Sequence, residues 1–317
     1  MWKTIKLHKF FILAIIIVLC LIGHSFFSYF NEYYYEPAKG YHRIKEICYE
    51  QQDWDHPYCE NFAHNKDHLE EWLESHDPSK EFEQLDVITL TSIIVEHYSF
   101  ASLQYFSPLI IAIAVAGMFH SHLKSGMFEN YLLRMDYKKY LRKIYRISLK
   151  ASLIMPVALI VIFLISCLIT GFNFDTSSVN SNMSVYSAWK YEHFFLYGAM
   201  ICLIQFFMSL VYANITLYCC RKNKNLLVAI VMSYIFFLVL DLFVYLVLYS
   251  LILNRIFGIK ELTDYFNIAG YWFFKEDSNG TIPLIVAFSL QLVSFLGLHQ
   301  IFKRKERLVL EYEKQVS

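Results

Sequence analysis

Six long apolar stretches constrain the fold of this chain more than any other feature. They cover residues 10–30, 100–120, 151–172, 194–219, 226–252 and 281–302, and Asp241 is the one formally charged residue within them. About 20 consecutive apolar residues are enough to cross the hydrocarbon core of a membrane. Since a backbone in lipid must satisfy its own hydrogen bonds, each stretch is predicted to be a helix.

The composition excludes several other classes of protein. Only 18% of the residues are charged and the mean hydropathy is +0.37, whereas an average soluble chain has about 25% charged residues. Glycine, proline and cysteine are too scarce for a disordered, collagenous or disulfide-scaffold protein. The 28 basic and 28 acidic residues balance, so no cationic domain indicates a nucleic-acid partner.

The charges are divided unevenly between the connecting segments. One alternating set of segments carries 19 basic and 5 acidic residues: 1–9, 121–150, 220–225 and 303–317. The other set carries 9 basic and 22 acidic residues: 31–99, 173–193 and 253–280. Basic residues near span ends stay in the cytoplasm. We therefore predict an all-α polytopic protein of the cell (plasma) membrane, with six transmembrane helices and both termini in the cytoplasm.

The extracytoplasmic loop 31–99 is strongly acidic, with 16 acidic and 5 basic residues. Within residues 65–76, the spacing of Leu69, Trp72 and Leu73 predicts a short amphipathic helix. Cys48 and Cys59 are the two cysteines outside the apolar stretches on this face, so they either form a disulfide or stay reduced. The histidines of this loop have spacings that zinc could use, but ordinary surface histidines are favoured, and we predict no metal and no cofactor.

Two further segments carry specific expectations. The amphipathic, aromatic segment 253–280 is predicted to lie at the outer interface or to enter the membrane and return. Asp241 should face the bundle interior or a wet cavity and have a partner, because a carboxylate in lipid is costly. Tyr245 lies one turn later on the same face. Contact with a substrate or proton and a bond that holds helices together both remain open interpretations of this pair.

The cytoplasmic loop 121–150 contains a short amphipathic pattern. Ser125-Gly126 interrupts the helical pattern, and Phe128, Tyr131, Leu132 and Met135 then form an apolar stripe flanked by Glu129, Arg134 and Asp136. Such a helix can dock into a groove of a partner. It can equally lie on membrane lipid, held by the basic residues between 138 and 146.

The layout resembles the permease subunits of type-2 ABC transporters. Among these, it is similar to the permeases of bacterial peptide or bacteriocin export and immunity systems. The residues that carry it are Gly126, Phe128, Glu129, Tyr131, Leu132, Leu133 and Arg134, followed by the basic connector 137–141. The resemblance implies that this segment couples to a cytoplasmic ATP-binding subunit. It also implies a homo- or heterodimer of permeases that moves a peptide or an amphipathic, lipid-like substrate.

No catalytic residues are predicted. The sequence has no phosphate-binding G-x-x-x-x-G-K-[ST] loop, no H-E-x-x-H and no G-x-S-x-G, so ATP hydrolysis would need a separate protein. A rival interpretation is a receptor or interaction protein that acts through the loop 31–99. A membrane enzyme that uses Asp241 with the outer histidines is a weaker third one.

Overall fold

The computed structural model describes residues 8–53, 56–62, 66–77, 85–96, 98–124, 137–174, 192–223, 225–258 and 280–303. All secondary structure in these ranges is helical. Six helices there are long and apolar enough to cross a membrane: Lys9–Glu50, Ser102–Ser121, Tyr137–Ile169, Phe194–Lys222, Leu226–Ile256 and Thr281–Lys303. The predicted all-helical architecture with six candidate spans is therefore confirmed for this part of the chain, and it is that of a multi-pass membrane protein.

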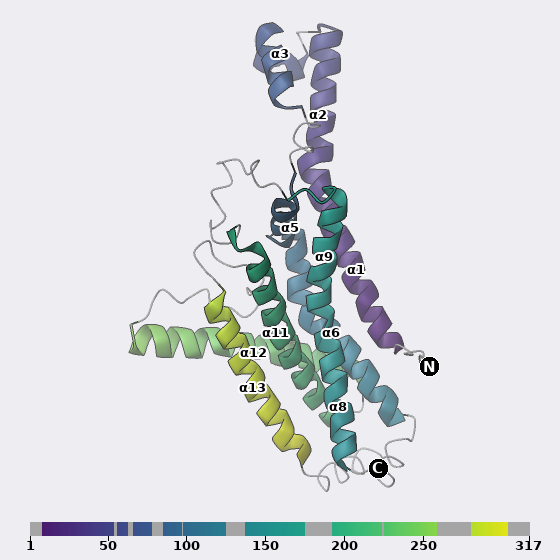
Figure 1. Cartoon of the computed structure of the whole chain (residues 1–317), viewed down its shortest axis with the longest axis vertical. Coiled ribbons are helices and arrows are strands. Elements are labelled where there is room, and N and C mark those ends of the chain that lie inside the picture. Colours follow the sequence, from purple (N-terminus) through teal and green to yellow (C-terminus); the bar gives the residue numbers. More distant parts are fainter. Residues whose placement is uncertain are drawn as a thin grey trace. The chain divides into compact units, whose positions relative to one another are not determined.

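The helices follow one another with few other elements between them (Figure 1). The α-helices are α1 (Lys9–Phe30), α2 (Glu36–Ile44), α3 (Lys66–Ser75), α5 (Val87–Glu96), α6 (Tyr98–Lys124), α8 (Tyr137–Ser152), α9 (Ile154–Ile169), α11 (Phe194–Lys222), α12 (Leu226–Phe243) and α13 (Thr281–Lys303). Wider π-helical turns form η1 (Asn31–Tyr35), η2 (Lys45–Glu50) and η5 (Val244–Ile256), and η3 (Pro57–Phe62) is a 3₁₀ helix.

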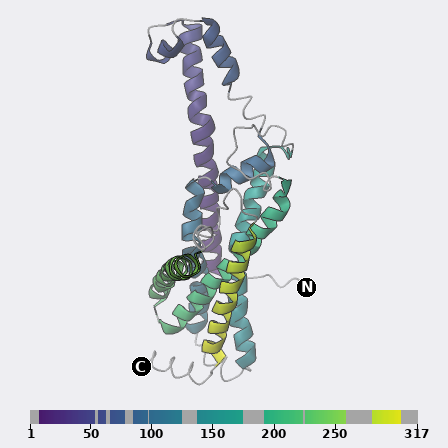
Figure 2. The same ribbon diagram turned by 90° about the vertical axis from the view of Figure 1, so that its left-hand side faces the viewer.

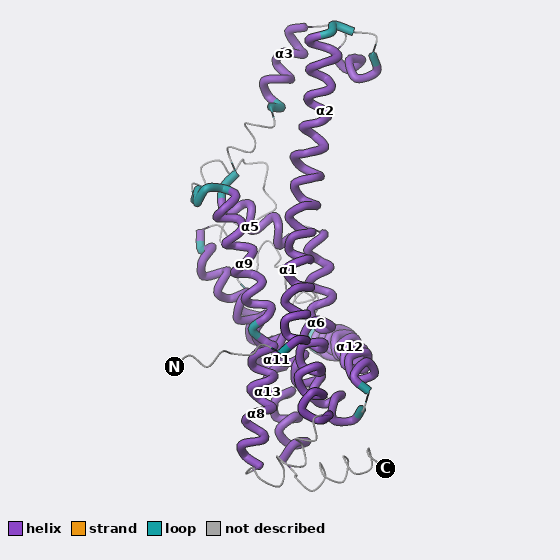
Figure 3. The backbone as a smooth tube through the Cα atoms, turned by 90° about the vertical axis from the view of Figure 1, so that its right-hand side faces the viewer, coloured by secondary structure: helices purple, strands orange, loops and turns teal. Residues whose placement is uncertain are grey.

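The first helix is much longer than its apolar stretch. Helical backbone runs from Lys9 through α1, η1, α2 and η2 to Glu50 without a break (Figure 3). A proline inside a helix removes one hydrogen bond and crowds the preceding turn. Pro37 is the second residue after the widened turn η1, and a widened turn is one way to accommodate that disturbance. The helix therefore continues for 20 residues beyond the predicted span 10–30, through the polar residues 31–50.

The chain divides into two compact units. The first comprises Met1–Leu21, Ala101–Val161 and Ser184–Ser317, and the second comprises Ile22–Phe100 and Ile162–Met183. In the first unit α11 packs against α8, α12 and α13. Helix α13 runs beside α11, whereas α12 and η5 lie across the direction of these two helices (Figures 1 and 2).

One glycine in the first unit permits a close contact between helices. A Cβ atom built on Gly117 of α6 would lie 2.2 Å from Cγ of Phe10 at the start of α1. No real side chain fits at that distance, so the Phe10 ring rests directly on the backbone of α6. Glycine at position 117 is the residue that this packing requires.

A proline in α6 is similarly accommodated. Pro108 lies inside α6 and has no N–H for the carbonyl of Gln104, four residues earlier. The hydroxyl of Ser107 donates a hydrogen bond to that carbonyl oxygen at 2.8 Å. A serine next to the proline thus satisfies the backbone group that the proline frees, as helices in lipid require.

The second unit contains a small domain that we call the headpiece, formed by residues 41–50, 57–62 and 66–77. Its interior consists of Cys48, Cys59, Phe62, Leu69 and Leu73, with Trp72 packed against them. α3 covers Lys66–Ser75, so the amphipathic helix predicted over 65–76 is present with Leu69 and Leu73 on its buried face.

Candidate functional site

Helix α11 is the centre of the first unit, and its buried face is unusually polar for an apolar helix. Gln205, Ser209, Tyr212 and Thr216 recur at intervals of three or four residues and are all buried. That spacing places them on one face of the helix. In lipid, polar side chains of this kind connect neighbouring helices. α11 therefore presents a polar stripe to the helices that surround it.

Asn214 is the centre of a junction of three helices. Its Oδ1 accepts a hydrogen bond from the Ser148 hydroxyl of α8 at 3.1 Å. Its Nδ2 donates to Oε1 of Gln291 at 3.4 Å and to Oγ of Ser294 at 3.0 Å, both on α13. The Ser294 hydroxyl in turn donates to the Gln291 carbonyl oxygen at 3.0 Å. Both amide hydrogens of Asn214 are engaged, so the junction satisfies its own donors in an apolar environment.

Asp241 of α12 is only partly buried, and it interacts electrostatically with Tyr212 of α11. Tyr212 also makes a hydrogen bond with Ser107 of α6, and its ring packs edge-on against Phe237, one turn before Asp241, with centroids 4.8 Å apart. Tyr245 lies just beyond the start of η5, 38% exposed, with its ring beside that of Tyr249.

An apolar cavity of about 300 Å³ lies between α11, α12 and α13. Its walls include Ile215, Tyr218, Phe236, Leu240, Val293 and Leu298. Asn214 and Ser294 of the polar junction lie at its wall, and Gly297 of α13 leaves open space where a side chain would project. A site of this size, mostly apolar with a few polar groups, is typical of small-molecule binding.

The ends of α8, α11 and α13 are joined by a set of contacts that we call the clasp: Tyr137, Arg221, Ile301 and Phe302. Arg221, 7% exposed, donates from Nη1 to the carbonyl oxygen of Ile301, and the Tyr137 hydroxyl donates to that of Phe302. The guanidinium also lies over the Phe302 ring, 5.1 Å from its centroid. A cation at these last carbonyls also interacts favourably with the dipole of α13.

Two histidines extend this linkage between helix ends. His120 near the end of α6 places Nδ1 3.2 Å from the Ala116 carbonyl oxygen and Nε2 3.2 Å from that of Asn223, and the ring nitrogen that carries the proton donates to its carbonyl. His299 of α13 bonds through Nδ1 to the Tyr145 hydroxyl of α8 at 3.1 Å. The ends of α6, α11 and α13 and the beginning of α8 therefore meet at one end of the unit.

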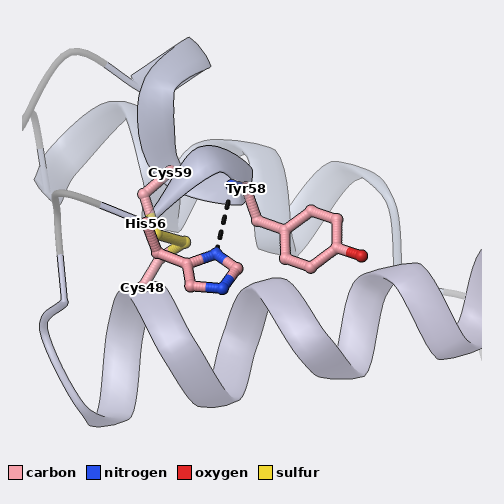
Figure 4. Close-up of a disulfide and its surroundings, with 4 residues drawn as sticks. All are labelled: Cys48, His56, Tyr58 and Cys59. Carbon is pink, nitrogen blue, oxygen red and sulfur yellow. Dashed lines mark hydrogen bonds between the residues drawn. A yellow bond between two sulfur atoms is a disulfide. The ribbon is translucent and has the colours of Figure 1, made fainter.

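The headpiece is fastened by a disulfide between Cys48 and Cys59, whose Cα atoms lie 5.6 Å apart. Figure 4 shows the Tyr58 backbone N–H bonded to Nδ1 of His56, with the two rings stacked beside the disulfide. The Trp72 ring packs against Tyr41, Phe62 and His76. Burial, and to a smaller degree the nearby charge of Asp77, raises the pKa of the Tyr41 phenol.

The outer surface of the headpiece is acidic. Exposed carboxylates surround the buried cluster, and they belong to Glu46, Glu50, Asp67, Glu70, Glu71 and Glu74. No group of three or more histidine, cysteine, aspartate or glutamate side chains in the described ranges could hold a metal ion. The described part of the headpiece thus offers a rigid acidic surface and no metal-binding cluster.

Several predicted features lie outside the described residues. They are the coupling residues Gly126, Phe128, Glu129, Tyr131, Leu132, Leu133 and Arg134, most of the segment 253–280, and all but the first residue of the tail 303–317. The basic connector that follows is described, and it forms the first turn of α8. Sequence reasoning did not find Asn214, Tyr212 or Arg221. The polar stripe of α11 was the available signal for Tyr212, whereas Asn214 lies on another face of the helix.

Comparison with known proteins adds no further assignment, because no protein family, curated protein or solved structure matches this chain.

Proposed function

We propose that this chain is the membrane-spanning permease subunit of an ABC transporter of the plasma membrane, working as a homo- or heterodimer and driven by a separate cytoplasmic ATPase. The substrate is a peptide or an amphipathic, lipid-like molecule. The sequence pattern at Gly126–Arg134 and the charge asymmetry of the loops support this proposal. So do six helices that are long and apolar enough to span a membrane.

The clasp is the observation that carries the proposal furthest. α8 begins at Tyr137, three residues after the proposed docking segment ends at Arg134. Its first residue is bonded to the end of α13, and Ser148 farther along α8 is bonded to Asn214 of α11. A displacement of the docking segment by an ATPase would therefore reach α11 and α13, the two helices that share the polar junction and the apolar cavity.

The charges of the connector fit such a role. α8 carries its basic residues on one side and buries Tyr140, Ile144 and Ile147 on the other. It continues through α9 as a candidate span that ends at Ile169. An amphipathic helix that merges into a transmembrane helix is suited to pass a movement at the membrane surface into the bilayer.

The direct test is a pull-down of the tagged chain from its own host in mild detergent, followed by an assay for co-purifying ATPase activity. We expect an ATPase that is retained by the wild type and lost in Phe128→Asp, because a charge on the apolar stripe disrupts docking. The matched control is Asn130→Asp, which adds the same charge outside the stripe and should retain the ATPase. Equal recovery with both variants would refute the proposed docking segment.

A receptor that moves no solute is the second candidate, and the headpiece favours it. A disulfide-fastened domain with an acidic surface is complementary in charge to a cationic ligand. This alternative predicts that deleting residues 40–80 abolishes function, whereas charge substitutions in 121–150 leave it intact. The transporter proposal predicts instead that charge substitutions in 121–150 abolish function.

A further inference from the structure

The apolar cavity between α11, α12 and α13 has features that define what can occupy it. Its volume of about 300 Å³ is twice that of an engineered cavity of about 150 Å³ that binds benzene. Among its lining side chains, Asn214 uses both amide hydrogens on Gln291 and Ser294, and the Ser294 hydroxyl donates to Gln291. These two polar groups are therefore already engaged with each other and with Gln291. Apart from them and Tyr218 the lining side chains are apolar, so the cavity favours an apolar part of a ligand.

The wall of the cavity on α13 is about as long as one leaflet of a bilayer is thick. Its wall on α13 runs from Leu290 to Ile301, which at the helical rise is about 16 Å. That is close to half of the hydrocarbon thickness of about 30 Å. The wall occupies the second half of α13, and on α11 it runs from Val211 to Tyr218, again in the half that ends at the clasp.

The end of the cavity nearest the clasp is flanked by positive charge. Lys222 lies one turn beyond Tyr218 on the same face of α11, and it is exposed. Lys303 is exposed at the last residue of α13, two residues after Ile301. Basic residues at the membrane surface attract anionic lipid headgroups. An apolar wall one leaflet long with cations at its end is complementary to one molecule, a phospholipid with an anionic headgroup.

We infer that this cavity binds one acyl chain of an anionic membrane phospholipid, with the headgroup beside Lys222 and Lys303. The acyl chain enters from the surrounding lipid and lies against Ile215, Val293 and Leu298, while Gly297 provides the room for it. The inference depends on the chain spanning a membrane, but it does not depend on an ATPase or on transport.

The test uses the full chain reconstituted in phosphatidylcholine vesicles that contain a phosphatidylglycerol with a photoactivatable diazirine in one acyl chain. After illumination, mass spectrometry locates the labelled peptides. We expect label on residues 211–218 and 290–301. Gly297→Phe should fill the cavity and lower that label at least tenfold. The matched control Gly198→Phe adds the same ring on α11 in open space away from the cavity, and it should leave the label unchanged.

Two further arms keep the inference open to refutation. If Gly297→Phe fails to fold, Val293→Trp fills the cavity from an exposed position instead. Lys222→Gln should weaken labelling by phosphatidylglycerol about fivefold, the effect of about one cation at an anionic surface, without changing labelling by a phosphatidylcholine with the same chains. Equal label in Gly297→Phe and Gly198→Phe, or label spread evenly over all lipid-facing helices, would overturn the acyl-chain site. Equal labelling by both lipids would overturn the headgroup assignment.

If the ATPase pull-down fails while this labelling succeeds, the transporter proposal is lost and the lipid site stands. The reverse result leaves the transporter proposal in place and removes the lipid site. The two experiments therefore fail independently.

Discussion

The headpiece and the polar junction around Asn214 are held together in opposite ways. The headpiece has a disulfide and a buried apolar cluster, with its charged side chains outside. The junction has no covalent bond among its members and joins three apolar helices through hydrogen bonds of Ser148, Asn214, Gln291 and Ser294. In water, burial of apolar surface drives assembly. In lipid that driving force is missing between helices, so polar pairs and close packing specify which helices meet.

The two regions also differ in how far apart their members are in the sequence. The whole headpiece lies within residues 41–77, whereas the junction joins residues 148 and 294. Closing a short loop by a disulfide constrains the unfolded chain directly. The junction can form only after α8, α11 and α13 have assembled. We therefore expect substitutions in the membrane region to leave the stability of the headpiece unchanged. Substitutions in the headpiece should likewise leave the stability of the junction unchanged.

The largest expected effect is the loss of the disulfide. We expect Cys48→Ser combined with Cys59→Ser to destabilise the headpiece by about 3 kcal/mol, because the unfolded loop of this length is no longer constrained. Limited proteolysis between residues 41 and 77 measures this loss, and thermal unfolding of the helices in detergent should change little. A reductant should reproduce the effect in the wild type and have none on the double variant. Unchanged protease resistance would contradict the role of the disulfide.

The second effect tests the junction. Asn214→Leu removes the amide that bonds Ser148, Gln291 and Ser294, so we expect a loss of about 1 to 2 kcal/mol in the free energy of unfolding in detergent. Thr216→Val is the matched control on the same helix, because the Thr216 hydroxyl bonds only the Tyr212 carbonyl of its own turn, and it should cost a few tenths of a kcal/mol. Equal destabilisation by the two variants would show that the junction does not specify the packing of α11.

These two regions also show what the sequence could and could not predict. The six candidate spans follow from composition, because a chain of this apolarity must place long stretches in lipid. α3 follows from the i, i+3, i+4 spacing of Leu69, Trp72 and Leu73, since one turn of helix brings them to one face. Pairwise contacts between spans do not follow in this way, because spacing reports only which residues share a face of one helix.

Asp241 illustrates that limit. The sequence offers Tyr245, four residues later on the same helix, as its neighbour. The structure adds an electrostatic interaction with Tyr212, which lies 29 positions earlier in the sequence on α11. The polar stripe of Gln205, Ser209, Tyr212 and Thr216 would have identified the buried face of α11, but not the helices that it faces. Arg221 looked like one more basic residue at a span end, and only its burial against α13 separates it from Lys222.

The third effect concerns the clasp. Arg221→Gln removes the cation at the end of α13, and we expect a loss of about 1 kcal/mol of unfolding free energy in detergent, with transport impaired while the ATPase still docks. Lys222→Gln removes the same charge from the neighbouring exposed residue, and it should cost less stability than Arg221→Gln and leave ATPase docking unchanged. Transport that survives Arg221→Gln would show that movement does not pass through the clasp.

The smallest expected effect is a pH dependence of the stability of the headpiece. The folded headpiece raises the pKa of Tyr41 above its ordinary value of 10.0, mainly by burial of the phenol. A raised pKa means that folding favours the neutral phenol, so this contribution is complete below pH 10 and is lost as the pH rises through the folded pKa. Tyr41→Phe cannot ionise and should lose less headpiece stability than the wild type between pH 9 and pH 11, a difference of a few tenths of a kcal/mol for a group that is largely solvated. Limited proteolysis of both chains at matched pH measures that difference. Identical pH profiles would mean that the stacking of Tyr41 on Trp72 tolerates the phenolate, and that the apolar cluster beneath, rather than the aromatic rim, carries the stability of the headpiece.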